Sequence, residues 1–446
     1  MNTTSAASLV KQSLLAAIER HQAELRELMG SLPDSLDDLA QVEETIRRGV
    51  LKLGRDLLQS WSEAADARTE PPECQECQER MRHKGYVEGP LLTTLGSVRV
   101  RRARFRCEHC GGEYYPHDQR LRFLGHGLSW PLAKVIGRLG AQLPFAQAGQ
   151  NLEADYGVRV SKHLLEQVCE GAGLAVLDRE DRERQQLQSQ PCAEQLQQLP
   201  DSPLRPEKAY VFADGTMLHT EGDWHEIRVA SVAAVDRHDA VLHREHRARF
   251  LSCEDFGWQL LLLARRAGYH HARLRVFLAD GARWLWDLAA THFPDAVQIL
   301  DWYHLTEHVH QTAAILYGEA SEQARRFSAA RLKELWAGRA AATCRRLREL
   351  RRQLRAPPKR EALRKLLGYL EHNRSRINYP RYRALGLQIG SGQVEGACKT
   401  LVGSRCKQAG MRNWTRRGAE GVLRLRAALQ TSHYDNLWST TLKAAA

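Results

Sequence analysis

The chain has 446 residues, a formal net charge of +12 and a pI of about 9.3. This length predicts several domains with an ample core, and the positive charge indicates a polyanionic partner. The opening MNTTSAASLVKQSLLAAIERHQ lacks the basic and uninterrupted apolar segments of a signal peptide, and no stretch approaches the roughly 20 apolar residues of a membrane span. We therefore expect a cytoplasmic protein without a membrane partner. Its ten cysteines would then be reduced and suited to metal binding.

Residues 5–62 are predicted to form two helices. In the second helix, apolar residues recur every three or four positions from Leu36 to Leu57 and form one stripe. Asp34 or Ser35 is expected to cap this helix. The stripe has two possible uses, which are packing within its own domain or pairing with another subunit.

Two CxxC pairs separated by 29 residues predict a metal site. The segment between them is rich in β-forming residues and has a turn at Gly96, so a hairpin would bring the two pairs together. Four thiolates in this arrangement suit one structural Zn²⁺ in a tetrahedral site, which predicts a zinc ribbon over residues 70–120. The expected ligands are Cys74, Cys77, Cys107 and Cys110.

A helix-turn-helix is predicted over residues 125–177. Pro131 and Pro144 each begin a helix, the second of these stops at Gly157, and Ser161 can cap the next. That last helix would present its exposed side chains to a DNA groove, although a helical hairpin without DNA contact is the alternative. The DNA contacts expected from this half of the chain are Lys162, His163 and Gln167, together with Arg101 of the ribbon.

Residues 178–206 are rich in Arg, Glu, Gln and Pro and are expected to end a helix and form a linker. From residue 207 to 304, three consecutive predicted strands precede an alternation of helix and strand. This order gives a mixed sheet with helices on its faces, as in an α/β core of ribonuclease-H-like type. Residues 305–385 have a helical pattern, are very basic and interrupt the core, which resumes over 386–432.

Three acids are the candidate catalytic residues. Asp214 and Asp280 each end an apolar strand and precede a glycine, and Glu395 lies one turn into a predicted helix. Carboxylates that separate rigid elements carry to one point are what a site for two Mg²⁺ (or Mn²⁺) ions requires. The rival ligands are Asp236, Asp287, Asp301 at the end of the fifth predicted strand, and Glu226 on the second, and we assign all of them supporting or structural roles.

Positive charge is concentrated in residues 331–426, which hold 25 Lys or Arg against 6 Asp or Glu. The rest of the chain holds 40 Lys or Arg against 47 Asp or Glu and is mildly acidic. A basic segment of this kind favours nucleic-acid binding, with a solvated helical face as the alternative. Ser391 is expected to cap the helix of Glu395. The DNA contacts expected here are Arg351, Arg352, Arg355, Lys399, Arg405 and Arg412.

Three stretches resemble the signature blocks of bacterial insertion-sequence DDE transposases of the ISKra type: DGTMLHTEGDWHEIRVASV, DGARWLWDLAATHFPDAVQILDWYHLTEH and IGSGQVEGACKTLVGSRCKQAGMRNWTRRGAEGVLRLRAAL. The resemblance covers roughly residues 70–445. It implies a ribonuclease-H-like fold with a helical insertion and a catalytic triad of Asp214, Asp280 and Glu395. The implied activity is Mg²⁺-dependent cutting at terminal inverted repeats and joining of the freed 3′-OH to target DNA. Double-stranded DNA and further copies of the chain would be the partners.

Two other functions stay open. A ribonuclease-H-like nuclease or resolvase would use the same metals without strand transfer. A non-catalytic DNA-binding regulator could keep the fold. Two DNA-reading modules before the core favour a transposase over a nuclease, and the presence of all three acids disfavours a regulator.

Overall fold

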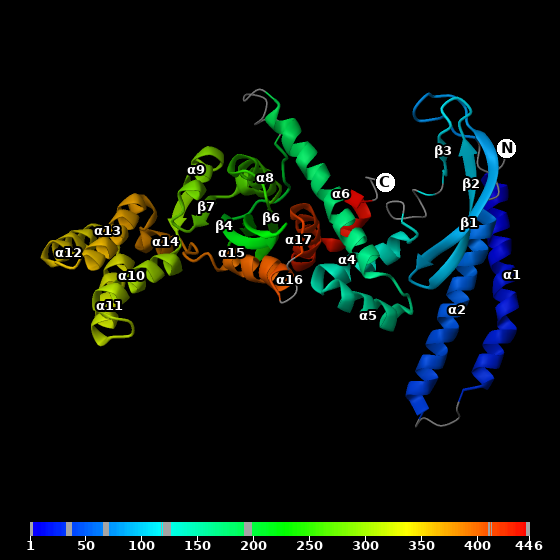
Figure 1. The fold of residues 1–446 in the computed structure, drawn as a ribbon, viewed down its shortest axis with the longest axis horizontal. Helices are drawn as coiled ribbons and strands as arrows, with labels where there is room; N and C mark the ends of the chain where they lie inside the picture. The colour runs from blue at the N-terminus through cyan, green and yellow to red at the C-terminus, as the bar shows by residue number, and fades with distance from the viewer. Residues whose placement is uncertain are drawn as a thin grey trace. The chain divides into compact units, whose positions relative to one another are not determined.

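The computed structural model divides into two compact units, Met1–Ala172 with Trp438–Ala446, and Gly173–Leu437 (Figure 1). Among the described residues, no helix combines the length and the apolarity needed to cross a membrane. The predicted helix cap at Asp34 or Ser35 and the predicted DNA contact Arg412 lie outside the described residues. The structure describes residues 3–32, 38–65, 71–116, 118, 126–190, 199–408, 411 and 413–442.

The first unit begins with the two predicted helices, α1 (Thr3–Gly30) and α2 (Leu39–Ala65), which pack against each other as a hairpin. The last turns of α2 also pack on the ribbon. Leu58 contacts the small cluster of Leu91, Val98 and Val100, and the Gln59 side chain accepts a hydrogen bond of 2.7 Å from the backbone N–H of Arg99. These contacts come from Leu58 and Gln59, which lie beside the predicted α2 stripe and are not members of it.

The ribbon is an antiparallel sheet in the order β1-β2-β3. Strand β2 alternates as a half-buried strand should: Val98 and Val100 are buried, whereas Arg99 and Arg101 are exposed. Gly96, at a φ of +112°, makes the tight turn between the first two strands. The strands are β1 (Arg82–Thr93), β2 (Gly96–Arg106) and β3 (Glu113–Tyr114).

Three helices follow the ribbon. Helix α4 (Trp130–Gln142) is capped by the Ser129 hydroxyl, α5 (Phe145–Tyr156) ends at a left-handed Gly157, and the Ser161 hydroxyl accepts from the backbone N–H of Leu164 at the start of α6 (Lys162–Gln188). The predicted helix boundaries are confirmed except at the end of α6. This helix is 27 residues long in total and continues to Gln188. The two units divide inside this helix, between Ala172 and Gly173, and not in the predicted linker.

Buried ion pairs explain why α6 continues. The charged residues from 178 onward were predicted to end a helix and begin a linker, yet several of them pair with arginines of the second unit. These pairs are Glu180 with Arg247 at 2.9 Å and Arg424 at 3.0 Å, and Asp181 with Arg249 at 2.8 Å, while Arg249 also binds Glu420 at 3.0 Å. The second half of α6 is therefore part of the second unit's core.

The second unit is built on a five-stranded sheet in the order β6-β5-β4-β7-β8. Strands β4, β5 and β6 are antiparallel neighbours, whereas β4, β7 and β8 are parallel, so the predicted mixed sheet is confirmed. Helices lie on it as predicted. The elements are β4 (Lys208–Thr220), β5 (Asp223–Val235), β6 (Val241–Arg249), α8 (Cys253–Arg266), η3 (Tyr269–His271), β7 (Leu274–Ala279), α9 (Arg283–His292) and β8 (Val297–Leu300).

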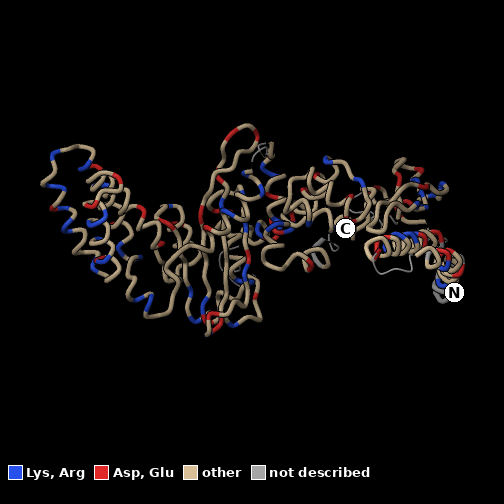
Figure 2. The backbone as a smooth tube through the Cα atoms, turned by 90° about the horizontal axis from the view of Figure 1, so that it is seen from below, with Lys and Arg blue, Asp and Glu red and all other residues tan. Residues whose placement is uncertain are grey.

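A helical insertion follows β8, as predicted, although β8 ends before Asp301 and residues 302–304 are helical. Figure 2 shows Lys and Arg along these helices. The insertion comprises α10 (Trp302–Tyr317), α11 (Glu322–Trp336), α12 (Ala340–Gln353), α13 (Pro357–His372), η4 (Arg374–Arg376) and α14 (Tyr379–Ala384). The chain then forms α15 (Gly392–Ala397), a π-helical segment η5 (Cys398–Gly403), α16 (Ser404–Cys406), α17 (Arg416–Gln430), α18 (Tyr434–Asn436) and η6 (Leu437–Leu442).

Candidate functional site

Asp214 and Asp280 are neighbours across two parallel strands. The ladder between β4 and β7 ends with the pair Phe212 and Leu278, and each aspartate comes two residues later, Asp214 within β4 and Asp280 just after β7. Asp214 was predicted to end a strand, but it lies inside β4. This strand continues beyond its pairing with β7 and pairs with β5 as far as Thr220. The two acids therefore meet where the parallel pairing stops.

Both carboxylates are half-buried, and His304 lies near Asp214. Burial raises the pKa of the Asp214 carboxyl above its usual value, and the negative charge of Asp280 adds to the increase. The backbone N–H of Gly215, which donates to Asp214 at 2.7 Å, opposes it. Two half-buried carboxylates that repel each other are an arrangement that a bound cation would stabilise.

Glu395 reaches the same area from α15, which packs on β4 and β5. Three residues later, the Cys398 sulfur lies 3.7 Å from Asp214 Oδ2. The carboxylate of Glu395 is about half exposed and binds the ammonium group of Lys399 at 2.6 Å. Among the described residues, the three acids are not one of the groups whose ligand atoms all lie within 4.8 Å. For all three acids to bind the same metal ions, Glu395 would therefore have to leave Lys399 and turn toward the two aspartates.

Asp301 holds the helix of Glu395 in place. Its side chain is fully buried; one oxygen accepts from the backbone N–H of His304 at 2.8 Å and caps α10, and the other accepts from the backbone N–H of Ser391. Both oxygens are thus used by backbone groups, which supports a structural role over that of a rival metal ligand. The Ser391 side chain, predicted to cap α15, makes no capping hydrogen bond.

We expect Asp301→Asn to lower the free energy of unfolding by about 1–3 kcal/mol, because the amide nitrogen cannot accept from a backbone N–H and one donor stays buried without a partner. Urea titration of the full chain measures this loss. Asp287→Asn is the matched control, since Asp287 is an exposed acid of the neighbouring α9. Equal stability of the Asp301 and Asp287 variants would contradict the assigned role.

Three further side chains pack against glycines that lie close in sequence to the acids. A Cβ on Gly215 would lie 2.4 Å from Glu226 Oε1, so Glu226 is pressed against the residue beside Asp214. Tyr369, from the insertion, lies against Gly281 in the same way, and Tyr303 lies against Gly390. Neither tyrosine was expected from the sequence. The sequence signal that could have indicated these contacts is the glycine at each of them, Gly281 and Gly390, because glycine permits the close approach of another group.

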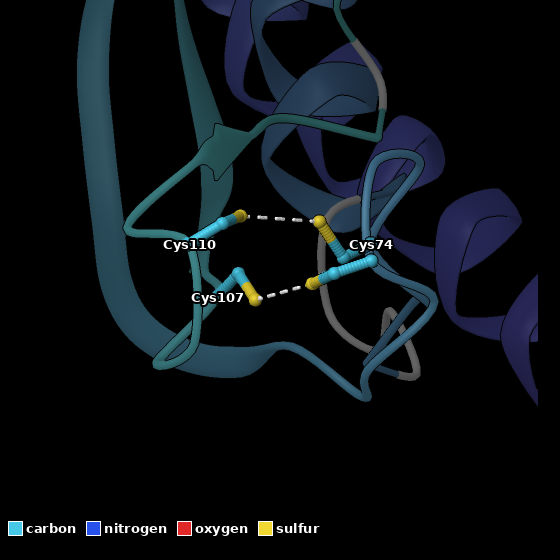
Figure 3. A group of neighbouring side chains, drawn as sticks. Cys74, Cys107 and Cys110 are labelled. Atoms are coloured by element: carbon cyan, nitrogen blue, oxygen red, sulfur yellow. Dashed lines mark hydrogen bonds between the residues drawn. The ribbon is translucent and has the colours of Figure 1, made fainter.

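The four predicted zinc ligands form a cluster in the first unit (Figure 3). The Cys74 and Cys110 sulfurs lie 3.5 Å apart, and those of Cys77 and Cys107 lie 3.4 Å apart. A tetrahedral site with Zn–S bonds of about 2.3 Å needs sulfur separations of roughly 3.8 Å, so small shifts would suffice. The donor set fits one structural Zn²⁺.

Backbone groups of the two knuckles prepare the thiols for a cation. The N–H groups of Cys77 and Glu76 lower the pKa of the Cys74 thiol to about 7. The Glu79 N–H acts in the same direction on Cys77 and has the largest single effect. The hydrogen bond with Cys107, burial and the bonds with Cys74 and Cys110 together outweigh it and raise the pKa of Cys77 to about 12. Ionisation of all four thiols therefore needs a nearby positive charge.

The predicted DNA contacts differ in exposure. Lys162, His163 and Gln167 are exposed at the start of α6, as expected. The outcome is mixed elsewhere: Arg101, Arg352 and Arg355 are exposed, Arg351 is half-buried, and Lys399 is engaged by Glu395. Arg405 is only 1% exposed and lies over the Trp414 ring at 4.9 Å, so its prediction as a DNA contact is wrong for this structure.

A second polar cluster consists of Asp201, His270 and His271. The two histidine Nε2 atoms lie 2.6 and 2.7 Å from the same Asp201 oxygen. These separations fit direct hydrogen bonds and are short for ligands that surround a common metal ion. The cluster attaches η3 to the segment before β4.

Comparison with known proteins finds no family model that matches the sequence and no significant match among curated proteins.

Proposed function

We propose that this chain is an insertion-sequence transposase with a ribonuclease-H-like core, which binds terminal inverted repeats, cleaves DNA phosphodiesters and joins the 3′-OH ends to target DNA. The observation that carries the proposal is the register of Asp214 and Asp280 on adjacent parallel strands, with the Glu395 helix packed on the same strands. The resemblance of the sequence around these three acids to DDE transposases supports it.

The sheet supports the fold assignment within this proposal. Three consecutive antiparallel strands are followed by two parallel ones, and the first strand in sequence, β4, lies at the centre. That is the arrangement expected of a ribonuclease-H-like domain. The helical insertion between β8 and α15 agrees with the same family pattern.

In this proposal Asp214, Asp280 and Glu395 hold two Mg²⁺ or Mn²⁺ ions. Bound metal would supply an activated water or 3′-hydroxyl nucleophile and would stabilise the leaving oxygen. Asp301 fixes the turn before α15 by binding the Ser391 N–H. Lys399 pairs with Glu395 in this structure and would be free to meet a phosphate if Glu395 bound metal instead.

DNA contact would be divided between two surfaces. The exposed Lys162, His163 and Gln167 at the start of α6 suit groove reading by a helix-turn-helix. The exposed arginines of α12 and the turn after it suit phosphate contacts, which add affinity without sequence preference.

The full chain should be tested with labelled duplexes that carry the DNA flanking its reading frame. Imperfect inverted repeats are expected there, and with Mg²⁺ the protein should cut at their ends and yield joined products with a second duplex. Cutting without joined products would favour the nuclease or resolvase alternative. Repeat-specific binding with neither reaction would favour the regulator.

The phosphate role gives a separate prediction. Replacing Arg352 and Arg355 together by Gln should weaken binding to repeat and random DNA alike. It should also reduce the slope of log K against log salt by up to about 0.9 for each arginine that pairs with a phosphate. Arg326→Gln is the control, because Arg326 is engaged by Glu322 on α11. Binding titrations at several salt concentrations measure the slope. A slope equal to that of the control would remove α12 from the DNA surface.

A further inference from the structure

One face of the α1–α2 hairpin is apolar and exposed. The large apolar side chains on it are each 40–62% exposed, and we call this set the hairpin stripe. Its members are Leu15, Ile18 and Met29 of α1, and Leu39, Ile46, Val50 and Trp61 of α2.

The helical repeat places these residues on one side of the hairpin. At about 100° per residue, the members on each helix fall within an arc of roughly 60°. On α2, the stripe lies between the side facing α1, which carries Gly49 and Leu53, and the side facing β2, which carries Leu58 and Ser62. Because α1 and α2 run in opposite directions (Figure 1), the stripe residues of both helices emerge on the same side of the hairpin.

This surface is large enough for a stable interface. Side chains of this size and exposure leave on the order of 600 Å² of accessible area, and a specific interface needs about 800 Å² from each partner, including its polar rim. The part of α2 before Gly54 lies beyond the contacts that hold its last turns to β2. Two helices alone bury too little apolar surface to be stable, so this part of the hairpin gains most from a partner.

We propose that the hairpin stripe joins two copies of this chain as an antiparallel four-helix bundle. The spacing on α2 is self-complementary: Leu39, Ile46, Val50 and the half-buried Leu57 are separated by 7, 4 and 7 positions. This pattern is symmetric about position 48. A two-fold axis there sets Leu39 of one copy beside Leu57 of the other, and Ile46 beside Val50, as an isologous interface requires.

The polar residues near the stripe agree with this partner. Arg47 and Arg48 both bind Glu44, and Lys52 binds Glu24, so these cations are paired within the chain. Arg47 also donates to the Asp155 carbonyl at 3.3 Å. Gln22 and Glu43 interrupt the stripe, one on each helix. Single polar residues of this kind fix the register of helical bundles.

The test is the mass of the full-length, zinc-loaded protein without DNA, measured by light scattering or sedimentation at low micromolar concentration. We expect a dimer for the wild type, and monomers for Ile46→Glu and for Val50→Lys, because each places a charge in the interface. Ile315→Glu should stay dimeric, since Ile315 is a comparably exposed apolar residue of α10 in the other unit. Circular dichroism and zinc content should match across all variants.

Mixing the two single variants tests the geometry. In the antiparallel arrangement, the glutamate of one variant meets the lysine of the other, so the mixture should recover dimers that neither variant forms alone. A monomeric wild type, dimeric single variants, or a mixture that stays monomeric would each overturn the proposal. None of these readouts depends on DNA cleavage, so the result is independent of the proposed function.

Discussion

Asp214→Asn, Asp280→Asn and Glu395→Gln should each reduce Mg²⁺-dependent cleavage by at least about a hundredfold, because each removes a charged ligand from a metal whose charge stabilisation is worth several kcal/mol. Binding to DNA ends should change little. Cleavage of a labelled duplex under single-turnover conditions measures the first effect, and gel-shift titration measures the second. Asp287→Asn is the control, as an exposed acid on α9 that pairs with Arg283 at 3.7 Å.

Asp214→Asn should also change the free energy of unfolding, and this effect does not depend on catalysis. The pKa of Asp214 is raised in the folded chain, so without metal its contribution to stability is fully present below its unfolded pKa of 3.8 and is lost as pH rises through the folded value. At pH 7 in EDTA, Asp214→Asn should therefore be more stable than the wild type. Added Mg²⁺ should stabilise the wild type and leave the variant nearly unchanged. Equal Mg²⁺ shifts for both proteins would contradict a metal site at this pair.

Cys107→Ser should release one Zn²⁺ per chain and unfold the ribbon while leaving the five-stranded sheet intact. The apolar cluster beside the knuckles consists of Cys74, Met81, Ala103, Phe105 and Cys107, so two of its five members are themselves predicted metal ligands. A core this small does not hold a fold by itself, whereas structural zinc contributes about 10–16 kcal/mol in small zinc-binding peptides. The stabilising free energy lost with the metal should therefore exceed the free energy lost from packing.

Metal analysis and hydrogen exchange test this prediction. In the variant, amides of β1 and β2 should exchange quickly, whereas those of β4 and β7 should stay protected. Cys253→Ser is the control, since Cys253 begins α8 in the second unit. This variant protein should bind zinc and exchange its amides as the wild type does. Freshly prepared wild-type protein without zinc, or a zinc-free variant with a protected ribbon, would contradict the assignment.

Local patterns in the sequence were sufficient for much of the fold. Alternation and apolar runs located the strands of the ribbon and the sheet, and the proline, glycine and serine signals located α4, α5 and the start of α6. The paired CxxC units identified the four-cysteine cluster, because knuckle and hairpin geometry follow from short-range spacing. The predicted proximity of the two aspartates agrees with the sheet register, because each comes two residues after the last pair of the parallel β4–β7 ladder.

The tertiary structure alone decided the features that depend on partners far away in sequence. Arg405 was predicted to contact DNA, but it is buried and lies over the Trp414 ring. Asp301 looked like a rival ligand until Ser391, ninety positions later, supplied a backbone donor. The sequence of α6 could not reveal that its charged end is buried, because burial depends on arginines that β6 and α17 bring to it. Spacing determines which way a side chain points on its own helix or strand, whereas the long-range packing of those elements determines what that side chain meets.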